Sequence, residues 1–204
     1  MTKDGTVGDA RGRLLDAAVA LVRRQGFSAT GVGQLCAAAG VSKGAFFHHF
    51  ASKEAMGVAA AEHWGAATGA VFAAAGYHAA ADGLGRVLAY LDLREAMIEG
   101  GTDAFTCLAG ALAGEVHQSH PAIARAAEAA IKDHARTLEA DFAAALAEAG
   151  VRGVDAGGLA LHVQAVLQGG FVLAKAEGNA EVARESVRHL RRYVRLLCRG
   201  EGDG

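Results

Sequence analysis

Residues 27–53 constrain the fold of this chain more than any other segment, because they read as two short helices joined by a tight turn. The first helix, with Thr30 as its N-cap, is predicted by apolar residues at the spacing of one helix face: Val32, Leu35, Cys36 and Ala39. Gly40 stands where a left-handed residue ends a helix, and Ser42 is suited to cap the next one. Two short helices around such a turn are typical of a helix-turn-helix, whose second helix lies in the major groove of DNA.

The composition favours an all-α protein. Of the 204 residues, 52% are hydrophobic and only one is a proline. Apolar residues at helical spacing predict further helices over residues 9–25, 53–75, 82–99, 121–150, 155–177 and 180–199. Residues 156–174 carry no charge, yet His162, Gln164 and Gln168 make this segment too polar for a membrane span. We therefore expect a helix buried on two sides and no association with a membrane.

Charge is distributed unevenly along the chain. Residues 1–60 hold seven basic and four acidic residues, a net charge of +3, whereas the remainder holds 13 basic and 18 acidic residues, a net charge of −5. A basic N-terminal third fits a DNA-binding domain, because phosphates supply much of the binding free energy, although a charge of this size is also ordinary for a solvated surface. Three widely spaced cysteines and the lack of a recognisable signal peptide predict a reducing, cytoplasmic location.

Several short motifs match one known family. They are Gly26-Phe27, the run AAGVSKG at residues 38–44, the aromatic-His-x-Phe motif that ends at Phe50, and Ser52-Lys53-Glu54. Over about residues 10–60 the chain resembles the DNA-binding domain of the TetR (tetracycline-repressor) family of transcriptional regulators, and residues 105–118 resemble one of its subgroups more weakly. The resemblance implies a three-helix DNA-binding domain (residues 1–52) and a helical effector-binding and dimerisation domain (residues 53–204). It implies a homodimer that represses transcription from palindromic operator DNA until a small hydrophobic effector releases it.

The motif and the chemistry of its residues predict which groups contact DNA: Thr30, Ser42, Lys43, Gly44, Ala45, Phe47, His48, His49 and Lys53. The two lysines would neutralise phosphates, while hydroxyls and the amides at helix starts would donate hydrogen bonds to them. Gly44 would let the backbone approach the duplex, and Ala45 would meet a thymine methyl group. The two histidines would reach a base edge or a phosphate.

The chain departs from the family pattern at three positions. Gly31 stands where many members have threonine, and His49 stands where many have a second tyrosine. Phe47 stands where a tyrosine usually donates its hydroxyl to a phosphate, so that hydrogen bond should be missing here.

The family resemblance places an effector site inside the helical body. A mostly apolar site with a few polar groups would be lined by Trp64, Phe72, Tyr90, Met97, Phe105, Cys107, Phe142, Gln164, Gln168 and Phe171. The last two helices would form the dimer interface, through Val163, Leu167, Phe171, Val187, Leu190, Val194 and Leu197. The last helix also carries a stripe of basic residues: Arg184, Arg188, Arg191, Arg195 and Arg199. A solvated face or a set of partners for carboxylates is favoured for this stripe over a second nucleic-acid surface.

Other functions stay open at this point. A helical small-molecule-binding protein without DNA binding is supported only by Phe47 in place of tyrosine. A redox or electrophile sensor acting through Cys107 requires an exposed, activated thiolate, and a buried inert thiol is the simpler reading. The chain shows no nucleophile elbow, phosphate-binding glycine loop or paired carboxylates, so we expect no enzyme activity and no cofactor. His117 and His120, with His134 further along the chain, suggest a metal site, but they have no Cys-x-x-Cys motif or fixed carboxylate beside them, and no metal is predicted.

Overall fold

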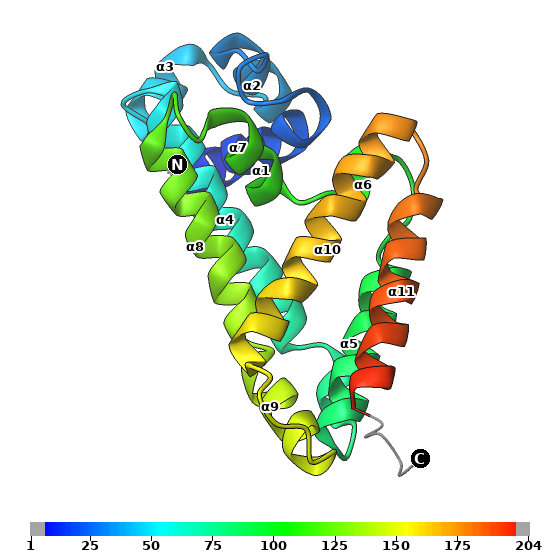
Figure 1. Ribbon diagram of the computed structural model, residues 1–204. Helices are drawn as coiled ribbons and strands as arrows, with labels where there is room; N and C mark the ends of the chain where they lie inside the picture. The colour runs from blue at the N-terminus through cyan, green and yellow to red at the C-terminus, as the bar shows by residue number, and fades with distance from the viewer. Residues whose placement is uncertain (1–6, 199–204) are drawn as a thin grey trace. The chain divides into compact units, whose positions relative to one another are not determined.

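The computed structural model describes residues 7–198, which form helices joined by turns and contain no strand (Figure 1). The all-α fold predicted from composition is confirmed for these residues. In chain order the elements are α1 (Val7–Gln25), α2 (Val32–Ala39), α3 (Lys43–His49), α4 (Lys53–Ala73), the 3₁₀ helix η1 (Gly76–Ala79), α5 (Gly83–Ala96), α6 (Thr102–Phe105), α7 (Leu108–Val116), α8 (Pro121–Arg136), α9 (Glu139–Glu148), α10 (Ala156–Glu177) and α11 (Glu181–Leu197).

The chain divides into two compact units. Unit 1 contains Met1–Gly69 and Cys107–Ile131, and unit 2 contains Ala70–Thr106 and Lys132–Gly204. Each unit therefore joins segments that are distant in the sequence. The predicted domain boundary after residue 52 stays a prediction.

The core of unit 1 forms where α1 packs against α2, α3 and α7. It is apolar, and the residues at most 2% exposed include Leu14, Leu15, Phe27, Leu35, Phe46, Leu108 and Leu112. Gly57 on α4 permits a close approach, because a Cβ there would lie 2.8 Å from the Phe27 ring and 2.7 Å from Ile123 Cδ1. Burial of this apolar surface is the main driving force that holds the α2–α3 pair in place.

The predicted helix-turn-helix is present as α2 and α3, but α2 begins at Val32, and the prediction of Thr30 as its N-cap is wrong. The Thr30 side chain is fully buried, and its hydroxyl donates to the Gly26 carbonyl at 2.6 Å. Thr30 therefore closes the turn after α1. Gly31 occupies the N-cap, and Gln34 Oε1 accepts from the Gly31 N–H at 2.8 Å, which satisfies the amide in the absence of a capping side chain.

The single helix predicted over residues 121–150 is wrong, since α8 ends at Arg136 and α9 begins at Glu139. At the break, the N–H groups of Thr137 and Leu138 donate to carbonyls three residues back, at 3.2 and 3.0 Å. The Thr137 hydroxyl donates to the His134 carbonyl at 2.7 Å. Such bonds tighten the last turn of a helix and end it, whereas the apolar periodicity continues across the break and conceals it.

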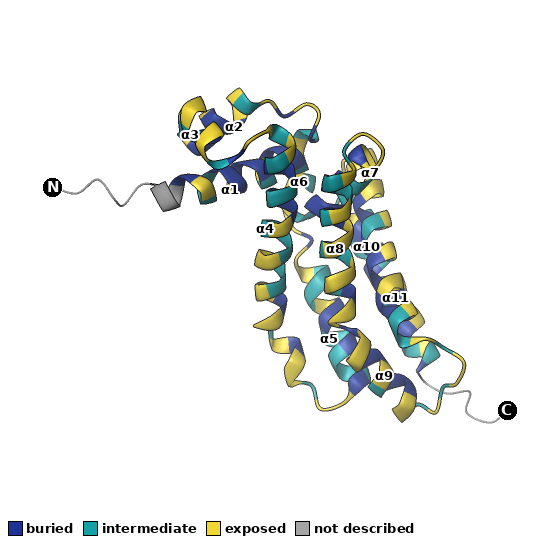
Figure 2. Cartoon of the chain, turned by 90° about the vertical axis from the view of Figure 1, so that its left-hand side faces the viewer, coloured by how far each residue is buried: buried dark blue, intermediate teal, exposed yellow. Residues whose placement is uncertain are grey.

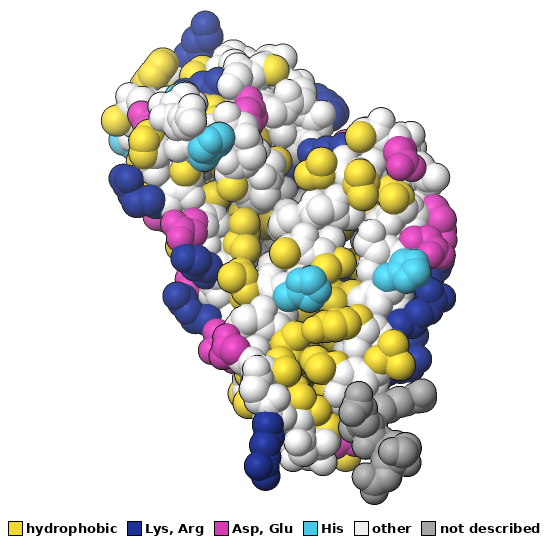
Figure 3. All heavy atoms as spheres, in the orientation of Figure 1, with side chains coloured by type: hydrophobic (Ala, Val, Ile, Leu, Met, Phe, Trp, Pro, Cys, Tyr) yellow, Lys and Arg dark blue, Asp and Glu magenta, His cyan; other side chains and the backbone are white. Residues whose placement is uncertain are grey.

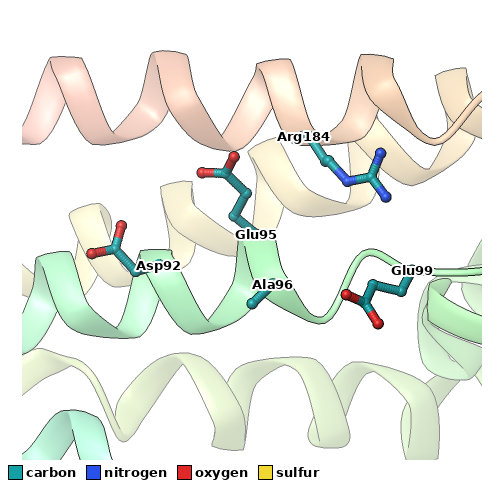
Figure 4. A pocket seen from close by; sticks show the side chains of 5 residues that line it. All are labelled: Asp92, Glu95, Ala96, Glu99 and Arg184. Atoms are coloured by element: carbon teal, nitrogen blue, oxygen red, sulfur yellow. The ribbon is translucent and has the colours of Figure 1, made fainter.

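Ion pairs join α5 and α11 within unit 2. Arg188 Nε lies 2.7 Å from Glu95 Oε1, and Arg191 Nε lies 2.9 Å from Asp92 Oδ1. Figure 4 shows an open hollow between these helices, lined by Asp92, Glu95, Ala96, Glu99 and Arg184. Arg184, Arg188 and Arg191 of the basic stripe therefore pair with carboxylates of their own subunit, as favoured from sequence. Arg195 is partly buried, and Arg199 lies outside the described residues.

Among residues 7–198, α10 is the one helix long and apolar enough, by length and composition, to cross a membrane. It nevertheless packs against α9 and α11, and its buried residues include Leu159, Val163, Leu167 and Phe171. Other residues of α10, among them Leu161, Val172 and Leu173, are exposed.

Six of the seven residues predicted for the dimer interface are buried inside the subunit: Val163, Leu167, Phe171, Val187, Leu190 and Val194. For these six the prediction is wrong, because they fill the core of unit 2, in which α10 packs against α11; Leu197 is partly buried. The exposed large apolar residues of these two helices are instead Leu161, Val172, Leu173, Tyr193 and Leu196. Figure 3 shows hydrophobic side chains gathered over α10 and α11.

Candidate nucleic-acid interface

The direction of α3 is set by the turn that precedes it. Gly40 has φ 64° and ψ 38°, and the Val41 N–H donates to the Cys36 carbonyl at 3.0 Å. This left-handed cap ends α2 and turns the chain sharply. Ser42 Oγ then accepts the Ala45 N–H at 3.1 Å and caps α3. The positions predicted for Gly40 and Ser42 as caps are therefore confirmed.

The two faces of α3 differ in chemistry. Phe46 and Phe50 are 0% and 5% exposed and anchor the helix in the core, whereas the neighbouring Phe47 is 57% exposed. The exposed side also carries Lys43, Gly44 and His48, with Ala45 and His49 partly exposed. Figure 2 shows that α3 has both buried and exposed parts. A Cβ on Gly44 would meet only Ser42 Oγ, at 3.7 Å, so the space outside this glycine is open. The outer face thus presents an ammonium group, imidazoles, one aromatic ring and bare backbone.

The two lysines predicted to bind phosphate differ in their surroundings. Lys43 is exposed and has no ion pair among the described residues. Lys53 is half-buried: its Nζ donates to the Ser28 carbonyl at 3.3 Å and lies 4.4 Å from the centre of the Phe27 ring. Burial lowers the pKa of Lys53, and the nearby Glu115 carboxylate offsets part of that effect. In this conformation Lys43 is available to a phosphate, whereas Lys53 is engaged inside unit 1.

Thr30 is among the residues predicted to contact DNA, and for this residue the prediction is wrong. Its hydroxyl is committed to the Gly26 carbonyl and its side chain is fully buried, so it has no surface to offer a duplex. Its role is to fix the start of the helix-turn-helix.

Glu115 on α7 is a residue that sequence reasoning missed. Its two carboxylate oxygens accept the N–H groups of Phe27 and Ser28 at 2.6 and 2.7 Å. Burial acts to raise the pKa of Glu115, but these hydrogen bonds and the charge of Lys53 outweigh it and hold the pKa below its usual value. Gly26, with φ 89°, leaves room for this carboxylate, because a Cβ there would lie 3.0 Å from Glu115 Oε2. The loop that leads into α2 is therefore held by a helix distant in sequence.

The residues predicted to line an effector site are divided between the two units. Trp64 and Cys107 belong to unit 1, where they pack against its core, and Trp64 stacks with Arg23 at 4.8 Å. The others belong to unit 2, where Met97 is exposed and Phe142 is buried. Met97, Phe142 and Gln168 lie in unit 2 outside the group described next, and their assignment to an effector site stays a prediction.

Five of the predicted residues gather in unit 2: Phe72, Tyr90, Gln164, Phe171 and Phe105, whose ring centre lies 5.9 Å from that of Phe171. Two further residues join them: Arg94, which sequence reasoning missed, and His134, which it considered only as a metal ligand. His134 Nε2 lies 2.8 Å from the Tyr90 hydroxyl, and the Phe72 and His134 ring centres are 4.4 Å apart. Burial, aided by the charge of Arg94, lowers the pKa of His134 to about 4, so its imidazole is neutral at pH 7. We call Phe72, Tyr90, Arg94, His134, Gln164 and Phe171 the unit 2 polar cluster.

Two family profiles match the chain in consecutive stretches. Residues 14–60 match the bacterial regulatory proteins of the tetR family, and residues 83–190, more than half of the chain, match the tetracyclin repressor-like C-terminal domain. The chain belongs to the TetR family. It is thus a transcriptional regulator, in a family whose members bind DNA through the helix-turn-helix and generally lack enzyme activity.

Individual relatives agree with this assignment. Over 52 residues, 26% of this chain, the sequence is 44% identical to the HTH-type transcriptional repressor KstR2 of Mycobacterium tuberculosis. That match spans 26% of the length of KstR2, so the chain matches about a quarter of this curated relative. A TetR-family regulator from Agrobacterium tumefaciens has the same fold, with a TM-score of 0.80 at 20% identity over 92% of this chain and 98% of that one. A TetR regulator from Chloroflexus aurantiacus also has this fold, with a TM-score of 0.79 at 25% identity over 92% of this chain and 95% of that one.

Proposed function

We propose that this TetR-family regulator is a repressor that binds palindromic operator DNA through the outer face of α3. The exposed face of that helix carries the proposal: Lys43 is unpaired among the described residues, and Gly44 leaves the backbone open to close approach. An ammonium group placed beside bare backbone suits a phosphate, while His48 and His49 have donors and acceptors for base edges. The exposed Phe47 ring suits the apolar contact that a thymine methyl group offers. Repression is supported by the name of the relative KstR2.

The dimer is proposed to form through the outer faces of α10 and α11. On α10, Leu161, Val172 and Leu173 are 46%, 67% and 48% exposed, and on α11, Tyr193 and Leu196 are 45% and 71% exposed. The His162 and Tyr193 rings meet at 5.7 Å, which joins the two helices on this outer side. A second copy would cover this surface with the same two helices in a four-helix arrangement. Two α3 helices could then enter successive major grooves about 34 Å apart, as palindromic half-sites require.

Effector release is proposed to act through unit 2. A ligand that binds one arrangement of the dimer more tightly than another shifts the population toward the arrangement that it prefers. If that arrangement does not fit the operator, the operator affinity falls, by at most the difference between the ligand's binding free energies for the two arrangements. The unit 2 polar cluster supports this role because it combines aromatic surface with a few converging polar groups. We place the protein in the cytoplasm, where its three cysteines, all free, stay reduced.

Selection of DNA sequences from a random library tests the proposal. The purified full chain should enrich a palindrome with half-sites one helical turn or a multiple apart. The variant Lys43→Ala should enrich the same palindrome with weaker affinity, because a phosphate contact positions the protein without specifying sequence. Enrichment of no common sequence by the wild-type protein would contradict operator recognition.

A further inference from the structure

Hydrogen-bond donors outnumber acceptors in the unit 2 polar cluster. The half-buried Arg94 has no ion pair among the described residues, and its one hydrogen bond is a long contact of 3.4 Å from Nη1 to the Tyr90 hydroxyl. Gln164, 4% exposed, also directs its amide Nε2 to that hydroxyl, at 3.5 Å. Arginine has five N–H donors and no acceptor, so most of the Arg94 donors have no protein partner among the described residues.

The contacts of the Tyr90 hydroxyl indicate which nitrogen of His134 carries the proton. Its oxygen receives the donors of Arg94 and Gln164, so its own hydrogen points to His134 Nε2 at 2.8 Å. The imidazole is neutral at pH 7, and its proton must then be on Nδ1. This Nδ1 is buried and has no hydrogen-bond partner within the described residues. A buried donor left unpaired costs about 1–3 kcal/mol, which an added acceptor would recover.

Aromatic rings surround the Arg94 guanidinium. Its central carbon lies 5.1 Å from the Phe72 ring centre, 5.9 Å from that of Tyr90 and 6.0 Å from that of Phe171. Rings that stack on a guanidinium hold it in place and leave its N–H edge free for a planar acceptor. Phe105, packed on Phe171, extends the aromatic surface beside it.

We propose that the effector of this regulator is an organic carboxylate with an apolar, preferably aromatic, body, and that Arg94 binds its carboxylate group in the unit 2 polar cluster. The inference rests on the proposed effector response and names its chemical class. A carboxylate matches the guanidinium edge with two hydrogen bonds, and the apolar body packs on Phe72, Phe105 and Phe171. The donors of His134 and Gln164 favour an acceptor and disfavour an amine.

A panel of matched probes tests this inference: phenylacetate, 4-phenylbutyrate and decanoate, each paired with its primary amide. Isothermal titration of the full chain should show at least one acid that binds about tenfold or more tightly than its amide. Arg94→Met should abolish that preference, because it keeps the apolar stem and removes the charge. Arg152→Met is the matched control, since Arg152 is exposed, lies outside the cluster, and should leave the preference unchanged.

The outcomes separate this inference from the proposed function. If no acid binds more tightly than its amide, or if Arg94→Met retains the preference, the carboxylate assignment is overturned. Operator binding is measured in the same samples without any probe, and its absence would overturn the proposed function instead. Wild-type operator affinity in the absence of probes shows that the Arg94→Met variant is folded. Arg94→Lys is a second variant, which keeps the charge but loses the paired hydrogen bonds.

Discussion

Unit 1 and unit 2 place their polar chemistry in opposite locations. In unit 1 the core is apolar and the functional groups of α3 are on the surface, where Lys43 and His48 face solvent. In unit 2 polar groups are inside, with Asp141 and Gln164 9% and 4% exposed, while Val172 and Leu196 are 67% and 71% exposed. The difference follows from the partner that each surface is proposed to meet. DNA requires cations and donors on the outside, a small ligand requires them inside, and a second subunit requires exposed apolar surface.

The largest effect is expected at the core of unit 1. Phe46→Ala should lower the free energy of unfolding by about 3–5 kcal/mol, because Phe46 is fully buried. Phe47→Ala, one residue along the same helix, should change it by less than about 0.5 kcal/mol. Chemical denaturation measures the free energy of unfolding of both variants. Equal losses of stability would show that α3 does not have one buried and one exposed face.

Lowering the pH should reduce the free energy of unfolding through the histidine inside unit 2, His134. Unfolded histidine takes up a proton below pH 6.5, whereas folded His134 stays neutral until about pH 4. The unfolded state therefore binds more protons in this window, and stability falls as the pH drops from about 6.5 toward 4, with a loss of about 2 kcal/mol by pH 5. His134→Gln still accepts from Tyr90 but does not titrate, so its unfolding free energy should lose less between pH 7 and pH 5. Parallel losses in the two proteins would argue against a buried neutral His134.

The exposed apolar face of unit 2 is tested by Leu196→Glu. A charge within the proposed subunit interface should weaken self-association by about 2 kcal/mol or more, roughly 30-fold. Val71→Glu is the control, because Val71 is 54% exposed but lies on α4. Light scattering over a concentration series measures the self-association of both variants. A Leu196→Glu protein that dimerises like wild type would place the interface elsewhere.

The smallest effect is expected from restoring the tyrosine at position 47. Phe47→Tyr should strengthen operator binding by about 1 kcal/mol per subunit, because the added hydroxyl donates to a phosphate. Stability should be unchanged, since the ring is 57% exposed. Anisotropy titrations with labelled operator measure the affinity, and a weaker Phe47→Tyr complex would show that the bare ring makes an apolar contact that the hydroxyl disrupts.

The helix-turn-helix of unit 1 could be predicted from sequence because its residues mark the turn between the two helices locally. Gly40 and Ser42 mark the turn by local chemistry alone, and both were correctly assigned. Thr30 was misplaced because a residue before a helix suits a cap, and only the tertiary fold shows its hydroxyl bound to Gly26. Glu115 could not be found, since its partners Phe27 and Ser28 lie far away in sequence.

Unit 2 was harder to predict because its helices are apolar on more than one side. Periodicity in α11 identified the stripe of Val187, Leu190 and Val194 but not whether it faces its own subunit or a partner. A signal for Arg94 was present: it continues the buried stripe of Val87, Tyr90 and Leu91 at helical spacing. A charged residue in line with buried ones is therefore a better marker of a site than the large aromatic residues that fill every core.

Operator affinity as a function of salt tests the central claim, that the outer face of α3 binds the DNA backbone, most directly. Lys43→Ala should lower affinity about tenfold or more and reduce the slope of log affinity against log salt by about 2 for a dimer, one phosphate contact per subunit. Arg125→Ala, which removes one exposed charge from α8, should leave the slope unchanged. A Lys43→Ala dimer with wild-type affinity and slope would contradict the account.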